Sequence, residues 1–150
     1  MRFKLSIVCI CWLWPILLSA QQVPFAFSYQ QKQMQGILTL PAGEGPFPLV
    51  IFVHGDGASN ANGFDYYPYY WQRFARLGFA SYAWSKAGVD GSQGNWLLQT
   101  MADRAGETIA AINAIKAHPQ IRDDKIGLMG FSQAGWVLPR VAQMSNYPDF

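Results

Sequence analysis

The sequence predicts an α/β fold in which helices flank a mostly parallel central sheet. Residues 49–53 (LVIFV) and 79–84 are largely apolar runs of strand length, as expected of strands that are buried on both faces. Residues 125–143 follow the pattern of a third short strand, a turn and a helix. The segments between these strands have helical spacing, and strands that alternate with helices are typical of parallel sheets.

The first twenty residues have the order of a signal peptide. Arg2 and Lys4 precede an apolar run over residues 5–18, and small residues then end at Ala20. An uncleaved membrane anchor is the alternative. The apolar run is, however, shorter than the roughly 20 residues of a spanning helix, and Pro15 interrupts it. We therefore expect cleavage after Ala20 and an exported protein, periplasmic or secreted, with no stable membrane association.

Residues 21–150 have the length and composition of a single domain. Cys9 and Cys11 both lie in the predicted signal peptide, so we expect no thiol or disulfide chemistry in the mature chain. Removing Arg2 and Lys4 from eleven basic residues leaves nine, which balance the nine acidic ones, so the net charge falls from +2 to zero. No basic stripe remains, and nucleic acid is not an expected partner.

Periodicity predicts the remaining elements. Aromatic residues alternate along 21–35, which indicates an edge strand or a hairpin. Large apolar residues recur three and four apart over 66–77, which predicts a helix that ends at Gly78. Pro139 is expected to kink the helix in which it lies. Another helix follows Asn95, a candidate cap, and its charged residues are expected to lie mostly off its apolar face: Asp103, Arg104, Glu107 and Lys116.

The turn over residues 130–135 carries the clearest chemical signal. Ser132 lies between Gly130 and Ala134, and a serine on a strained strand-to-helix turn needs small residues at those two positions. The following helix directs free N–H groups and the positive end of its dipole at the serine oxygen. Such a field stabilises the oxyanion that forms in acyl transfer. The alternative is an ordinary strand-to-helix turn that happens to contain a serine.

A second candidate loop follows the strand at 49–53. His54-Gly55-Asp56-Gly57 comes at the carboxyl end of that strand, where open α/β folds bind ligands. Aromatic residues over 64–67 could line a pocket nearby, although ordinary packing explains them as well. The glycine-rich stretch 86–94 lacks the spacing of a nucleotide-binding loop. His118, before a proline at the end of a predicted helix, is interpreted as structural.

The stretch Gly130-Phe131-Ser132-Gln133-Ala134 resembles the G-x-S-x-G nucleophile elbow of the α/β-hydrolase superfamily, with alanine in the last place. The chain is most similar to dienelactone hydrolases and acyl-thioesterase-like enzymes. This resemblance implies that Ser132 is the nucleophile and that the N–H groups of Gln133 and Asp56 hold the oxyanion. It implies that His54 supports the oxyanion loop. It also implies a small-molecule acyl substrate and no cofactor or metal.

The resemblance has two departures. After the strand at 79–84, many members carry an acid and an arginine where this chain has Ser85 and Ala87. The superfamily's catalytic acid and histidine follow the nucleophile. After Ser132 this sequence has only Asp149, which comes too early to be assigned, and no histidine.

The resemblance thus implies that residues 21–150 are the N-terminal portion of a longer α/β-hydrolase domain, inactive by themselves, with the strand before Ser132 at an apolar sheet edge. Two functions are open. The first is a serine hydrolase that cleaves an ester, thioester or related acyl bond. The second is a non-catalytic hydrolase-fold binding protein or pseudoenzyme.

Cleavage of the signal peptide is directly testable. N-terminal sequencing of the exported protein is expected to begin at Gln21, because the small residues before it suit a signal peptidase. An Ala20→Arg variant, which removes the small residue at the cleavage point, should accumulate uncleaved. Recovery of intact Met1 in the membrane fraction of wild type would contradict the prediction.

Overall fold

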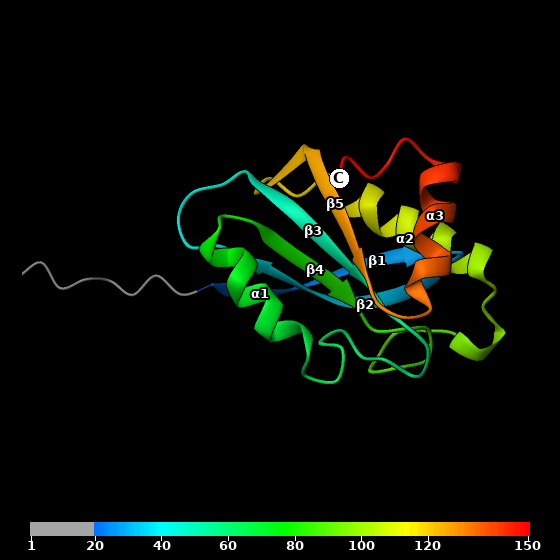
Figure 1. Ribbon diagram of the computed structural model, residues 1–150. Coiled ribbons are helices and arrows are strands. Elements are labelled where there is room, and N and C mark those ends of the chain that lie inside the picture. Colours follow the sequence, from blue (N-terminus) through cyan, green and yellow to red (C-terminus); the bar gives the residue numbers. More distant parts are fainter. Residues whose placement is uncertain (1–19) are drawn as a thin grey trace, which may run out of the picture.

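The computed structural model describes residues 20–150, so the predicted signal peptide lies outside the described residues except for Ala20. Its centre is a five-stranded sheet with the strand order β1-β2-β4-β3-β5 (Figure 1). β1 (Gln21–Tyr29) and β2 (Lys32–Leu40) pair antiparallel. They are joined by Gln30 and Gln31, whose φ angles of 49° and 62° are those of a tight hairpin turn. The hairpin predicted from the alternating aromatic residues is therefore present.

The inner strands are parallel. β3 (Phe47–Val53) lies between β4 (Ala80–Trp84) and β5 (Ile121–Gly130) and pairs in parallel with both. β2 joins this group antiparallel to β4. The carboxyl ends of β3, β4 and β5 consequently meet at one edge of the sheet, and the loops that follow these three strands form the site described below.

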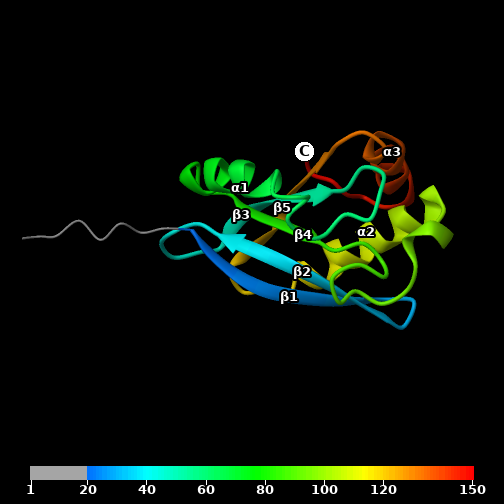
Figure 2. The same ribbon diagram turned by 90° about the horizontal axis from the view of Figure 1, so that it is seen from below.

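Helices cover both faces of the sheet, as the apolar strands require (Figure 2). α1 (Tyr67–Arg76) packs on the face that carries Val50 and Phe52. α2 (Met101–Ile115) and α3 (Ala134–Met144) pack on the other face, with Leu49, Ile51 and Val53. Successive residues of β3 thus enter two different cores. The predicted α/β fold with a mostly parallel sheet is confirmed.

The helix expected after Asn95 begins later than predicted. The Asn95 side chain caps only a single 3₁₀ turn, η1 (Trp96–Leu98), by accepting from the Leu97 N–H at 3.0 Å. The true cap of α2 is Thr100, which forms a reciprocal capping box with Asp103. The prediction missed this cap because Asn95 and Thr100 are both good cap residues and the apolar spacing extends across the gap.

Two charged residues of α2 are placed wrongly by the sequence prediction. Arg104 and Glu107 are not off the packed face; they are only 7% and 4% exposed. Arg104 donates to the His54 carbonyl in the loop after β3, and Glu107 accepts from the indole of Trp84, the last residue of β4, so their burial is compensated. Apolar periodicity cannot reveal this, because it scores a charged residue as surface.

β5 is the edge of the described sheet, as expected. It starts at Ile121, before the apolar stretch, because the polar residues after Ile121 still continue the strand. The end of the chain lies beside it (Figure 1): the Asp149 N–H donates to the Ile126 carbonyl at 2.8 Å and the Leu128 N–H to the Phe150 carbonyl at 3.2 Å. The Asp149 carboxylate also accepts from the Ile126 N–H. Asp149 therefore has a structural role at this edge.

Pro139, which was expected to kink its helix, lies inside α3. Helical geometry continues from Ala134 to Met144, with Pro139 inside it. Pro139 and Gly135, the residue four earlier, are both exposed. The Gly135 carbonyl, which loses its helical donor, can therefore be hydrated.

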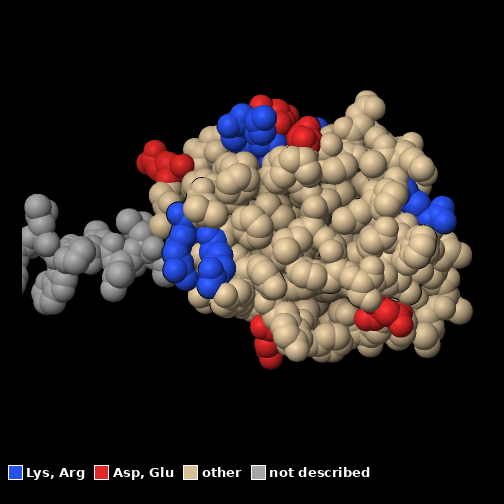
Figure 3. All heavy atoms as spheres, viewed as in Figure 1, with Lys and Arg blue, Asp and Glu red and all other residues tan. Residues whose placement is uncertain are grey.

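Charged side chains are sparse on the face seen in Figure 3, where lysine and arginine form small separate groups. Within residues 20–150, no helix is both long and apolar enough to cross a membrane.

Candidate active site

Ser132 lies on the sharp turn between β5 and α3. Its φ of 54° is in the left-handed region that residues with a side chain rarely adopt. The turn is closed by the Gly135 N–H, which donates to the Ser132 carbonyl at 2.9 Å. A Cβ at Gly130 would lie 2.6 Å from the Cβ of Ala134. The small residues at 130 and 134 therefore allow the close strand-to-helix packing that presents an exposed Ser132.

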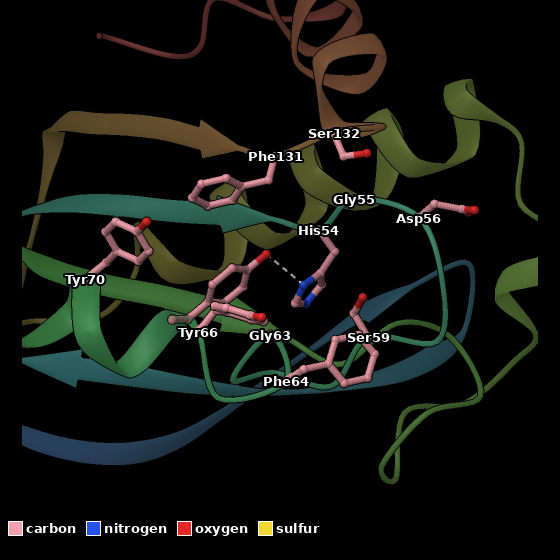
Figure 4. Close-up of a pocket in the computed structure, with 11 residues that line it drawn as sticks. His54, Gly55, Asp56, Ser59, Gly63, Phe64, Tyr66, Tyr70, Phe131 and Ser132 are labelled. Atoms are coloured by element: carbon pink, nitrogen blue, oxygen red, sulfur yellow. Dashed lines mark hydrogen bonds between the residues drawn. The ribbon is translucent and has the colours of Figure 1, made fainter.

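The loop after β3 packs directly against this turn (Figure 4). A Cβ at Gly55 would lie 3.0 Å from the Phe131 carbonyl oxygen and 3.1 Å from the Cβ of Ser132. Such distances are tighter than ordinary van der Waals contacts, so only glycine fits without displacement of the turn. The His54–Gly57 loop and the predicted nucleophile Ser132 are thus brought together.

Two backbone N–H groups beside Ser132 remain open to a ligand. Within residues 20–150, the N–H groups of Asp56 and Gln133 have no intramolecular hydrogen-bond acceptor. Gln133 is the N-cap residue of α3, so its N–H also lies at the positive end of the helix dipole. The structure leaves the two predicted oxyanion donors available, one from each of the packed loops.

His54 is buried at 3% exposure, and both of its ring nitrogens are engaged. Nε2 lies 2.5 Å from the Trp84 carbonyl oxygen and Nδ1 lies 3.0 Å from the Tyr67 hydroxyl. Since a carbonyl only accepts, Nε2 carries the proton and Nδ1 accepts from the Tyr67 hydroxyl in the neutral imidazole. Burial lowers the pKa of His54 from 6.5 to about 4. The ring therefore joins β4 and α1 and has no free nitrogen for Ser132.

Arg104, on α2, connects the loop after β3 with the turn at Ser132. Its guanidinium donates to the His54 carbonyl at 2.5 Å and to Oε1 of Gln133 at 2.6 Å. The Gln133 amide in turn donates to the Asp56 carboxylate at 3.2 Å. The side chains of the two residues with open N–H groups are therefore linked to each other and to one buried cation.

Lys86 and Glu107 extend this buried polar group. Lys86 donates to the Gly55 carbonyl at 2.6 Å, and burial, together with the nearby charge of Arg104, lowers the pKa of Lys86 to about 8. Glu107 accepts from the indole of Trp84 and from the Gln99 amide, and burial raises its pKa. None of these contacts follows from the hydrophobic pattern of the sequence. The available signal was the three-residue spacing of Arg104 and Glu107, which places both on the packed face of α2.

A cavity of about 400 Å³ opens beside Ser132 (Figure 4). Aromatic rings form much of its wall, with Ser59 and the loop after β3 on another side; the rings are those of Phe64, Tyr66, Tyr67, Tyr70 and Phe131. Tyr66 is 73% exposed, whereas Tyr67 is buried against Phe52. The aromatic segment thus serves both of the roles that the sequence left open.

Comparison with known proteins identifies the family. The profile of a protein family described as Esterase FrsA-like matches residues 17–147, which is most of the chain. The chain belongs to the FrsA-like esterase family. An esterase-type hydrolase is the activity class of this family, in agreement with the resemblance to α/β-hydrolases. No curated protein sequence matches the chain.

Solved structures share the fold of this FrsA-like chain. The α/β hydrolase GrgF from Penicillium sp. sh18 has a TM-score of 0.70 at 20% identity, over 86% of this chain and 43% of GrgF. A cold-adapted esterase from an Arctic intertidal metagenomic library has a TM-score of 0.68 at 18% identity, over 86% of this chain and 58% of that esterase. A dienelactone hydrolase-like promiscuous phosphotriesterase from metagenomic libraries has a TM-score of 0.61 at 18% identity, over 84% of this chain and 55% of that enzyme.

These matches confirm the α/β-hydrolase fold and the likeness to dienelactone hydrolases. The chain spans about half the length of the solved structures it matches.

The burial of neutral His54 predicts a pH-dependent stability. In the unfolded chain a histidine binds a proton near pH 6.5, whereas folded His54 does so only near pH 4. The contribution of neutral His54 to the free energy of unfolding is therefore present above pH 6.5 and is lost as the pH falls towards 4. The free energy of unfolding, measured with urea, should fall by about 2 kcal/mol between pH 7 and pH 5 because of this one group.

A His54→Gln variant removes the titrating ring, so its free energy of unfolding should change less over the same range, whatever its stability at pH 7. His118→Gln removes the other histidine of residues 1–150 and is the matched control, which should keep the wild-type pH dependence. Equal slopes for wild type and His54→Gln would contradict the assignment.

Proposed function

We propose that this protein is a serine hydrolase that cleaves a carboxylic ester, thioester or related acyl bond through an acyl-enzyme on Ser132. The observation that carries the proposal is the left-handed backbone of Ser132, on a turn packed against the Gly55 loop with two open N–H groups beside it. Membership in an esterase family supports the same reaction class.

The reaction follows from these groups. Ser132 Oγ attacks the substrate carbonyl carbon, and the carbonyl oxygen becomes an oxyanion held by the N–H groups of Asp56 and Gln133. The intermediate collapses, the bond to the leaving group breaks, and the proton from Oγ passes through a general base to the leaving group. Water then attacks the acyl-enzyme by the same route and releases the carboxylic acid.

We propose that the general base and its orienting acid lie beyond residue 150. His54 is unsuited to this role, because its nitrogens are occupied by the Trp84 carbonyl and the Tyr67 hydroxyl. The chain also spans about half the length of the matched hydrolase structures, in keeping with a contribution from further residues.

The substrate, in this proposal, is a small molecule whose acyl part enters the cavity beside Ser132. The rings of Phe131 and Tyr70 lie 5.8 Å apart between their centroids on the wall next to the nucleophile. Exposed aromatic side chains around a cavity favour binding of an apolar group. The order of residues 1–20 supports export, so we propose that the protein acts outside the cytoplasm.

A second candidate is a hydrolase-fold protein that binds an acyl compound without cleaving it. The full engagement of His54 favours it, because His54 is the described histidine that lines this cavity and neither of its ring nitrogens is free to activate Ser132. The two candidates differ in one observable property, the nucleophilicity of Ser132.

A fluorophosphonate probe measures that nucleophilicity. Applied to the protein as its gene encodes it, the probe is expected to label wild type and to leave Ser132→Ala unlabelled, because the probe reacts only with an activated serine. Ser145→Ala is the matched control: Ser145 ends the same helix, where its hydroxyl donates to the Val141 carbonyl at 2.8 Å.

The control should be labelled like wild type. Labelling of Ser132→Ala at the wild-type rate would contradict the nucleophile assignment. A folded wild type that is not labelled would favour the binding protein.

A further inference from the structure

Lys86 occupies an unusual position for a lysine. It follows β4 and is only 2% exposed. Its own N–H donates to the Ser59 carbonyl at 3.0 Å, which fixes its backbone to the loop after β3. Its ammonium lies 5.1 Å from the centroid of the Trp96 ring and 2.6 Å from the Gly55 carbonyl oxygen. A buried lysine loses much hydration, so such specific contacts must compensate for its burial.

The hydrogen bond from Lys86 to the Gly55 carbonyl also affects the next residue, Asp56. The carbonyl of Gly55 and the N–H of Asp56 belong to one planar peptide group, in which a trans bond points them in opposite directions. A side chain that holds this carbonyl therefore also sets the direction of the Asp56 N–H. The N–H is on the side of the peptide away from Lys86, and within residues 20–150 no acceptor of its own orients it.

The loop needs such a restraint. Gly55 and Gly57 flank Asp56, and glycine permits backbone rotations that other residues resist. The preceding peptide is already held, because Arg104 donates to the His54 carbonyl. Lys86 is the side chain that holds the next peptide, the one that carries the Asp56 N–H.

We propose that Lys86 is a positioning residue, which holds the Gly55 carbonyl and thereby directs the Asp56 N–H at the oxyanion. This inference rests on the proposed function of Ser132. Lys86 acts through the peptide and does not touch the substrate. A donor that is fixed before the reaction costs no reorganisation when the oxyanion forms, so Lys86 contributes to the transition state and little to substrate binding. The charge of the ammonium also polarises the peptide and strengthens the N–H as a donor.

The site contains other charges that must stay unchanged in a test. Arg104, Asp56 and Glu107 all act on Lys86 electrostatically. Lys86→Arg retains the charge and the donor groups, whereas Lys86→Met removes both and keeps an unbranched apolar stem. Lys116→Met is the matched control, because Lys116 also combines a hydrogen bond to an oxygen with a position over an aromatic ring, both at Tyr147.

The first measurement does not depend on turnover. ¹⁵N relaxation gives the order parameter of the Asp56 amide in the protein as its gene encodes it. We expect a rigid value of about 0.85 in wild type, Lys86→Arg and Lys116→Met, and a value below about 0.6 in Lys86→Met. An Asp56 amide as rigid in Lys86→Met as in wild type would overturn the inference, whether or not the protein hydrolyses esters.

The second measurement is hydrolysis of a p-nitrophenyl ester. Lys86→Met is expected to lower kcat at least tenfold with KM within twofold of wild type, while Lys86→Arg recovers kcat to within threefold and Lys116→Met changes neither. If Lys86→Arg were as impaired as Lys86→Met, the lysine would be a proton-transfer group and the positioning role would be overturned. Absence of turnover in wild type would refute the proposed function alone and leave the relaxation measurement to decide this inference.

Discussion

The left-handed backbone at Ser132 is the constraint on which the rest of the site depends. It requires a sharp exit from β5 into α3, and that exit is possible only because Gly130 and Ala134 leave room for each other. The same turn comes so close to the loop after β3 that a Cβ at position 55 would have to displace it. One strained residue thus determines the small residues around it and brings two loops into contact. Strain of this kind is retained where the surrounding packing holds it and where function uses it.

Buried charged side chains form hydrogen bonds to both of the loops that meet at Ser132. Arg104 bonds a carbonyl of one loop and the Gln133 side chain of the other, while Lys86 bonds the Gly55 carbonyl. Glu107 provides a negative charge among them and anchors Trp84. Buried charges are tolerated when their polar atoms are hydrogen-bonded, as these are, and such networks favour one arrangement of the backbone over others. The polar group behind the site therefore accounts for the order of a loop rich in glycine.

The fold was largely predictable because it depends on local patterns. The apolar run over residues 49–53 indicates a strand that is buried on both faces, and the small residues around Ser132 indicate a tight turn. The contacts of Arg104, Glu107 and Lys86 were not predictable, because each reaches a backbone or side-chain partner far away in the sequence. A hydrophobic pattern treats these residues as surface, and only the three-dimensional arrangement shows which carbonyls and amides they satisfy. Residue type and spacing thus predicted the sharp turn at Ser132 and the loops, whereas long-range hydrogen bonds required the structure.

Two N–H groups on separate loops are proposed to point at one oxyanion beside Ser132. A crystal structure of the protein phosphonylated by the fluorophosphonate probe would test this arrangement, because the phosphonyl oxygen occupies the place of the oxyanion. We expect a covalent bond from Ser132 Oγ to phosphorus and a phosphonyl oxygen at roughly 2.7–3.1 Å from both the Asp56 and the Gln133 nitrogen atoms. A phosphonyl oxygen that contacts neither nitrogen, or phosphorus on another residue, would contradict it.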